Sequence, residues 1–302
     1  MEAATQPVPA GAAAPPAHRA ARRPPRSVRR KKLLITIADH SILIALAIMF
    51  VAPFVFIVLT SLMTDNQALS TNLWPDPLQL RNYSDVFDAA PILTYGLNSF
   101  IYAGLATLGV VVSCVPVAYA LARLRWRGRN VAFIVVLATM MLPAQVTIVP
   151  LYVLFSKLHL VGSLAPLIIP NWLGDAFSIF LLRQFFMTIP EEYADAARVD
   201  GAGELRVMLL VVARLAKPAI AAVALFAFLY AWNDFFGPLL YTGENEAHWT
   251  LSVGLSQFHT IHQVQWNLTM AATLLFMLPV IALFVAAQKA FVEGVTLTGV
   301  KG

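Results

Sequence analysis

The stretch EEYADAARVDGAG, residues 191–203, is rich in acids and small side chains and stands between two long apolar segments. Pro190 precedes it and suits the first turn of a helix, where its missing N–H is not needed. The two glutamates that follow complement the positive end of a helix dipole. Gly201 is a natural helix stop, because glycine readily adopts the left-handed conformation that ends many helices. The stretch therefore predicts one self-contained helix of about 16 Å, followed by a sharp turn.

The composition around this stretch is that of an integral membrane protein. Of 302 residues, 59% are hydrophobic and 12% charged, and the mean hydropathy is +0.72. An ordinary soluble domain has roughly 25% charged residues, and a soluble core of this length would need more polar surface to cover it. We expect an all-α membrane protein.

Six apolar runs are long enough to cross a bilayer, whose core of roughly 30 Å needs about 20 residues per helix. The first is too long for the apolar part of a signal peptide and lacks a convincing cleavage site, so we expect it to remain as an anchor. The fourth is the weakest, because it contains Pro170, Asn171 and Asp175. The predicted spans are 37–62, 93–121, 131–155, 163–187, 213–240 and 268–292.

Lysine and arginine placement predicts the orientation, because cytoplasmic segments carry the excess of these residues. The leading segment to Lys32 holds eight, the connector after the second span four, residues 183–217 five, and the C-terminal tail two. Arg81 and Lys157 remain for the outer side. We therefore expect the 191–203 helix and both termini in the cytoplasm.

The sequence predicts two parts of different character, an N-terminal tail and a transmembrane domain. Residues 1–32 begin with MEAATQPVPAGAAAPPA, an Ala/Pro-rich run that predicts disorder. The basic part, residues 19–32, can bind anionic lipid headgroups, so the net positive charge does not indicate nucleic-acid binding. Residues 33–302 form the transmembrane domain, with a cytoplasmic loop at 188–212.

Motifs for nucleotide binding and hydrolysis are absent from the sequence. It contains no GxxxxGKS or GxxxxGKT phosphate loop, no GxSxG and no HExxH. His259 and His262 in HTIH have a ligand-like spacing, but two histidines alone make a poor metal site. Cys114 is the single cysteine, so an intrachain disulfide is excluded. We expect no cofactor or metal on this chain, and an enzyme has the least support.

The predicted helix at 191–203 favours a docking role. Its spacing puts four residues on one face: Tyr193, Ala196, Ala197 and Asp200. Alanine side chains let another surface approach closely. The alternative is an amphipathic connector on the bilayer, but Tyr193 and Val199 are its only large apolar residues, too few to anchor it well.

At this point the sequence resembles a known family. IPEEYADAARVDGAGELRVMLLVVARLAKP resembles the EAA loop in permease subunits of ABC importers, whose pattern is roughly EAA, three residues and G. Asp195–Ala196–Ala197 matches the triplet, with Asp in place of Glu, and Asp200–Gly201–Ala202 matches the following DGA. Arg214 stands where the family often has Pro. Three more stretches support the resemblance: YALARLRWRGR, YAWNDFFGPLL and QKAFVEGVTLTGVKG.

The resemblance runs from about residue 37 to Gly302 and is greatest to carbohydrate-type permeases, particularly the second subunit of maltose-like systems. It implies a type I ABC importer permease fold and half of the pathway for a sugar, with a disaccharide or oligosaccharide first and glycerol-phosphate compounds and amino sugars behind. It implies as partners a second permease, two cytoplasmic ATPase subunits that use ATP and Mg, and an extracytoplasmic solute-binding protein, in a prokaryotic plasma membrane.

The resemblance also implies which residues couple the permease to its ATPase. The tail from Glu293 is a further candidate contact with that subunit. Within the loop, six residues form the expected coupling element: Glu192, Asp195, Ala196, Ala197, Asp200 and Gly201.

The solute path is less well marked. Sugars favour aromatic faces with hydrogen-bonding groups nearby, although the same residue types also make helix–helix contacts and interfacial belts. Six residues are candidates to line the path: Asn98, Tyr102, Asn171, Trp232, Asn233 and Asp234.

Two other classes of function stay open. An ion-driven carrier should show buried ionisable residues or broken helices in matching halves. Here the charged residues of the spans are few and unpaired in sequence, as with Asp39, Asp175 and Asp234. A membrane scaffold without transport would dock a partner but show no dependence on a solute.

Overall fold

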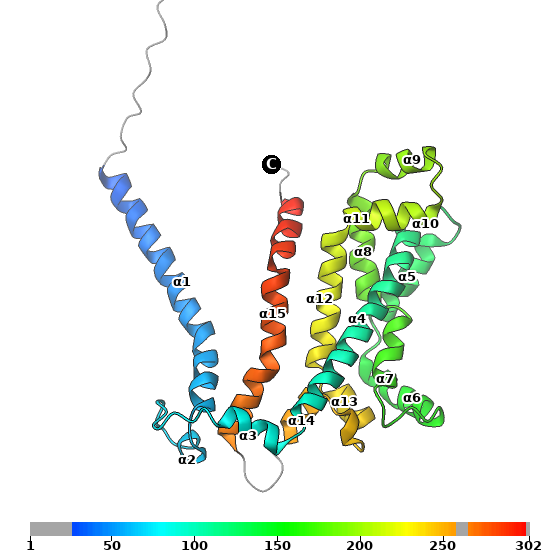
Figure 1. Ribbon diagram of the computed structural model, residues 1–302. Helices are drawn as coiled ribbons and strands as arrows, with labels where there is room; N and C mark the ends of the chain where they lie inside the picture. The colour runs from blue at the N-terminus through cyan, green and yellow to red at the C-terminus, as the bar shows by residue number, and fades with distance from the viewer. Residues whose placement is uncertain (1–25, 258–264, 300–302) are drawn as a thin grey trace, which may run out of the picture. The chain divides into compact units, whose positions relative to one another are not determined.

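Helices make up all the regular structure that the computed structural model describes, which covers residues 26–257 and 265–299 (Figure 1). The all-α prediction is confirmed for these ranges. His259 and His262 lie outside them, as does most of the tail predicted at 1–32. The tail from Glu293 is described as helix to Gly299.

The chain divides into two units, residues 1–54 and 55–302. The first contains most of α1 (Arg26–Ser61). From Ile35 to Phe54 every side chain of α1 is exposed, and most are apolar on all sides of the helix. A helix without a polar face needs an apolar surrounding. This agrees with the first predicted span.

The second unit begins with the last residues of α1 and continues with two short helices, α2 (Asp65–Ala68) and α3 (Asn82–Ala89), which precede the long α4 (Ile92–Ala122). The chain then continues through α5 (Arg129–Thr139), α6 (Ala144–Lys157), α7 (Ala165–Ile168), η1 (Ile169–Trp172), α8 (Ala176–Thr188), α9 (Glu192–Val199), α10 (Glu204–Arg206), the π-helical η2 (Val207–Val212), α11 (Ala213–Leu215), α12 (Lys217–Asn233), α13 (Phe236–Thr242), η3 (Glu246–His248), α14 (Leu251–Gln257) and α15 (Trp266–Gly299).

Four of the six predicted spans are long, apolar helical segments among the described residues: Ile35–Ser61, Ile92–Ala122, Ala165–Thr188 and Trp266–Ala286. The third predicted span, 131–155, is instead divided into α5 and α6. Pro143 stands between them with ψ 134°, an extended conformation. Proline lacks the N–H that a continuing helix needs and disfavours helical geometry in the residue before it. Each half alone is shorter than a span.

The fifth predicted span, 213–240, is interrupted twice. Glu204–Leu215 and Lys217–Asn233 together count as one more span, but they are bent by 82° at Ala216. Pro218 in the first turn of α12 fits a new helix start. At the other end α12 stops before Asp234, whose ψ of 123° is extended and whose carboxylate Oδ1 accepts the N–H of Gly237 at 3.1 Å. The second interruption therefore has a local cause, the hydrogen bond that Asp234 accepts from the first turn of α13.

The helix α4 is central to the second unit and packs against α8 and α12, while α15 packs against α12 and α3. Small side chains on its buried side, such as Ala103 and Ala106, allow this close approach. Gly109 shows how close it is, because a Cβ there would lie 2.5 Å from Trp172 Cδ1. An aromatic cluster that includes Tyr102 surrounds the first half of α4, and an aliphatic cluster surrounds the second half.

Candidate functional site

The helix α9 is the helix that the sequence predicts, and it ends as predicted at Gly201. This glycine has φ +82°, the left-handed conformation. Its N–H donates to Arg198 O at 3.0 Å, and the N–H of Ala202 donates to Ala197 O at 2.9 Å. These two bonds form a Schellman motif, which satisfies carbonyls at the end of a helix. The turn holds α9 in one orientation relative to the chain that follows it.

One face of α9 is available for docking. Tyr193 is 56% and Val199 88% exposed, and Ala196 lies between them, also exposed. On the opposite side Ala194 is buried, where α9 packs on η2. Of the face predicted from spacing, Ala197 is the exception, since it is half-buried. The exposed surface thus carries a small side chain in its middle and a large apolar side chain at each end.

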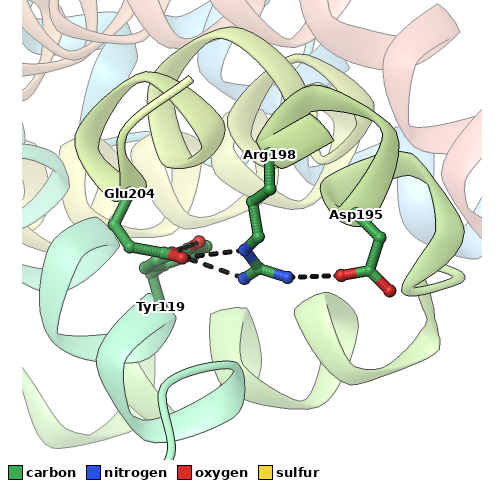
Figure 2. A network of polar contacts seen from close by, with 4 residues as sticks. All are labelled: Tyr119, Asp195, Arg198 and Glu204. Carbon is green, nitrogen blue, oxygen red and sulfur yellow. Dashed lines mark hydrogen bonds and ion pairs between the residues drawn. The ribbon is translucent and has the colours of Figure 1, made fainter. Parts of the chain in front are cut away.

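Arg198 connects α9 to the helices below it (Figure 2). Its Nη1 lies 2.7 Å from Asp195 Oδ1, and its Nε lies 2.8 Å from Glu204 Oε1. The hydroxyl of Tyr119 donates to the second oxygen of Glu204 at 2.6 Å. Hydrogen bonds to Glu204 and to Asp195 raise the pKa of Arg198 above its ordinary value. Charge-assisted bonds of this kind are shorter and stronger than neutral ones.

Two arginines join the neighbouring ends of α4 and α8. Arg123, directly after α4, donates through Nη2 to the carbonyls of Phe186 and Ile189. In the reverse direction, Arg183 on α8 donates through Nε to Leu121 O at 3.1 Å. Each guanidinium therefore satisfies carbonyls at the C-terminal end of the other helix, where a positive charge also complements the helix dipole.

At the opposite end of α4, two of the predicted path residues meet. The hydroxyl of Tyr102 donates to Asp234 Oδ2 at 2.9 Å, and Ser252 Oγ donates to Asp234 O at 2.6 Å. With its bond from the Gly237 N–H, Asp234 joins α4, α12, α13 and α14 at one point. This carboxylate has partners for both of its oxygens.

Residues 114–297 match the family model described as the inner membrane component of binding-protein-dependent transport systems. The chain belongs to this family.

Curated relatives and a solved structure agree with the family. This permease is 31% identical over 262 residues to the arabinooligosaccharides transport system permease protein AraQ of Bacillus subtilis (strain 168), across 85% of this chain and 92% of AraQ. It is 32% identical over 270 residues to the sn-glycerol-3-phosphate transport system permease protein UgpE of Salmonella typhi, across 86% and 95%.

The solved structure is that of a bacterial ABC transporter involved in the import of the acidic polysaccharide alginate. The match has a TM-score of 0.76 and 25% sequence identity, and it covers 89% of this permease and 99% of the other chain. The ABC importer permease fold is therefore confirmed.

The remaining predicted path residues of the permease have local partners. Asn98 donates to Ala247 O and Trp249 O, each at 2.9 Å. The amides of Asn171 and Asn233 each donate to a carbonyl four residues earlier. Trp232 is 1% exposed, and it packs against three rings at 4.8–5.6 Å: Phe100, Phe228 and Phe276. Asn98 and Trp232 therefore stabilise helix packing.

Asn233 also lines an open surface hollow of about 330 Å³ between α12, α14 and α15, with Ser252, Ser256 and Phe276 on its wall. Asp175, an acid inside the fourth predicted span, caps α8 by accepting the Ser178 N–H at 2.8 Å. The described residues contain no group of three or more side chains that could hold a metal.

Sequence reasoning missed four residues that connect α9 to the permease core: Tyr119, Arg123, Arg198 and Glu204. The pairing of Asp195 with Arg198 has a local signal, because residues three apart on a helix are neighbours. Tyr119 and Glu204 are 85 positions apart, and no periodicity in one sequence joins residues at that distance.

Proposed function

We propose that this permease forms half of the translocation pathway of an ATP-driven importer for a short oligosaccharide, and that α9 couples it to a separate ATPase subunit. The observation that carries the proposal is the exposed face of α9, held by a fixed turn at Gly201 and by Arg198. A surface with alanine in its centre and apolar side chains at its ends fits a cleft in another protein.

The remaining parts of the importer follow from the family. The permease would pair with a second homologous permease, two cytoplasmic ATPase subunits that use ATP and Mg, and an extracytoplasmic solute-binding protein. Its own contribution would be six spans, with α5 and α6 together acting as the third, and both termini in the cytoplasm of a prokaryotic cell. Residues 188–212 would be the coupling loop.

The coupling residues take distinct roles in this proposal. Ala196 and Ala197 allow close approach, and Gly201 sets the turn. Glu192 and Asp200 are exposed acids that can accept hydrogen bonds from the ATPase. Asp195 keeps an exposed carboxylate although one of its oxygens pairs with Arg198.

A sugar is the favoured solute because AraQ belongs to an arabinooligosaccharide system and the solved relative to an alginate importer. Among the path residues, Asn233 has the best placed polar side chain because it lines the open hollow beside Ser252 and Ser256. Asp234 and Tyr102 would shape the adjoining wall, and Asn98, Asn171 and Trp232 would support it.

The test is co-purification of this permease, expressed with its neighbouring permease, against candidate sugar-importer ATPases. Wild type should retain an ATPase, whereas Gly201→Asp and Ala196→Arg should lose it while remaining inserted in the membrane. Ala89→Arg, which changes another exposed alanine, on α3, is the matched control and should behave as wild type. Retention by both α9 variants would place the contact elsewhere and contradict the coupling role of α9.

A further inference from the structure

The helix α4 contacts both ends of the segment that carries α9. Arg123 donates to the carbonyls of Phe186 and Ile189, just before α9. Tyr119 donates to Glu204, just after α9. The two residues on the α4 side are four positions apart, so they stand one helical turn and about 6 Å from one another.

The link from α9 to α4 on the second side is short and continuous. Arg198, in the last turn of α9, contacts Glu204, and Glu204 accepts the Tyr119 hydroxyl, with successive distances of 2.8 and 2.6 Å (Figure 2). The ring of Tyr119 is 3% exposed and packed in the aliphatic cluster. Because this ring is fixed in the core, a displacement of Glu204 is resisted by α4 itself.

The chain itself takes a different route. Covalently, α9 is connected to α8 on one side and to α10, η2, α11 and α12 on the other. On the second side the route passes the 82° bend at Ala216. By contrast, α4 is a single helix of 31 residues, about 46 Å long. Its other end carries Asn98 and Tyr102, which hold the segment at 247–249 and Asp234.

Resting on the proposed function, we infer that α4 receives the displacement of α9 through Tyr119 and Arg123 and carries it to the far end of the permease. Tyr119, Arg123 and Glu204 are then positioning residues for the conformational change. This gives a role to the YALAR portion of the stretch YALARLRWRGR. The competing route, in which movement enters only through the covalent connections to α8 and α12, needs none of these side chains.

The experiment reads the far end of α4 in the complete transporter, with its partner permease and ATPase. Leu93, in the first turn of α4, is 77% exposed, so Leu93→Cys in a Cys114→Ala chain is the reporter. Reaction of this cysteine with a maleimide shifts the mass of the permease band. The rate of the reaction is measured with and without a non-hydrolysable ATP analogue.

We expect the analogue to change the modification rate in the reporter chain. Tyr119→Phe should reduce that change to about a third or less, because it removes one hydrogen bond to a charged group. Glu204→Gln should reduce it too, and the double variant should be no worse than the more severe single variant, because both break one link. Arg123→Lys should be intermediate, since it keeps a charge but loses the planar pair of donors.

Tyr83→Phe is the matched control, because Tyr83 lies on α3, away from the coupling loop, and its hydroxyl is 2.8 Å from Ser61 Oγ at the end of α1. It should leave the ATP-dependent change intact. The inference is overturned if Tyr119→Phe responds to the analogue as wild type does, or if the reporter chain shows no response at all while the ATPase still co-purifies. Failure of the ATPase to bind wild type would instead overturn the proposed function together with this inference.

Discussion

At the scale of single residues, Gly201 and Gly203 differ in a way that can be measured. Gly201 has φ +82°, whereas Gly203 has φ −70°, and neither has a neighbour within 4 Å of an added Cβ. A methyl group would therefore fit equally well at either glycine, and only the backbone conformation distinguishes the two positions. A left-handed conformation costs an ordinary residue roughly 1–2 kcal/mol.

We predict that Gly201→Ala loosens the end of α9 and Gly203→Ala does not. Limited proteolysis within residues 188–212, in membranes, should be faster for the first variant and unchanged for the second. Equal proteolysis of the two variants would show that the turn at Gly201 does not restrain the loop.

A second prediction at this scale concerns Gly254 on α14. A Cβ there would lie 2.3 Å from Tyr95 Cδ2, which is closer than real contacts, whereas one at Gly104 would meet nothing within 4 Å. Overpacking typically costs about 1–3 kcal/mol. Gly254→Ala should lower the thermal denaturation midpoint in detergent, and Gly104→Ala should not. An unchanged midpoint for both would mean that α14 shifts without cost.

Residue-scale prediction from sequence succeeded where the signal was local. Gly201 was correctly predicted as the stop after α9, because such a stop acts within one turn, whereas Pro190 lies before the helix, which begins at Glu192. Spacing also put Ala197 on the exposed face, but it is half-buried, since η2 packs beside α9. The contact of Tyr119 with Glu204 depends on how three helices meet, and that information is not carried by any short stretch.

At the scale of elements, the spans were predicted best where the chain is uniformly apolar. The apolar segments within α1, α4 and α15 begin at Ile35, Ile92 and Trp266, each within about two residues of the predicted start. The prediction weakened where a polar group or proline interrupts the run. Pro143 divides the third span, and Asp234 ends α12 by capping α13. Length and hydropathy do not detect such breaks, because a cap needs only one side chain.

The junction at Asp234 leads to an element-scale prediction. Asp234→Asn keeps an oxygen that can accept from Tyr102 or from the Gly237 N–H, whereas Asp234→Ala keeps neither. A buried hydroxyl without a partner costs about 1–3 kcal/mol, and loss of a helix cap about 1 kcal/mol. The alanine variant should therefore denature at a clearly lower temperature than the asparagine variant. Equal midpoints would mean that the carboxylate does not hold α4 to α13.

At the scale of the whole molecule, the distribution of lysine and arginine predicts that α9 and the segment after α13 lie on opposite sides of the membrane. Cys114 is buried, and Cys114→Ala leaves a chain without cysteine. In that chain, Val199→Cys should react with an impermeant thiol reagent only from the cytoplasm, and Glu244→Cys only from outside. Both positions are exposed. Reaction from the same side would show that α12 does not cross the bilayer.

The bend at Ala216 has a geometric consequence for the whole permease. Glu204–Leu215 and Lys217–Asn233 meet at 82°, so they form two nearly perpendicular arms of about 18 and 25 Å. If the pair pivots as a rigid bracket at Ala216, a rotation of about 10° displaces the end of the short arm by about 3 Å and the end of the long arm by about 4 Å. A push at the end of the short arm, directed parallel to the long arm, would emerge as a sideways swing at the far end of the long arm, beside the open hollow that Asn233 lines.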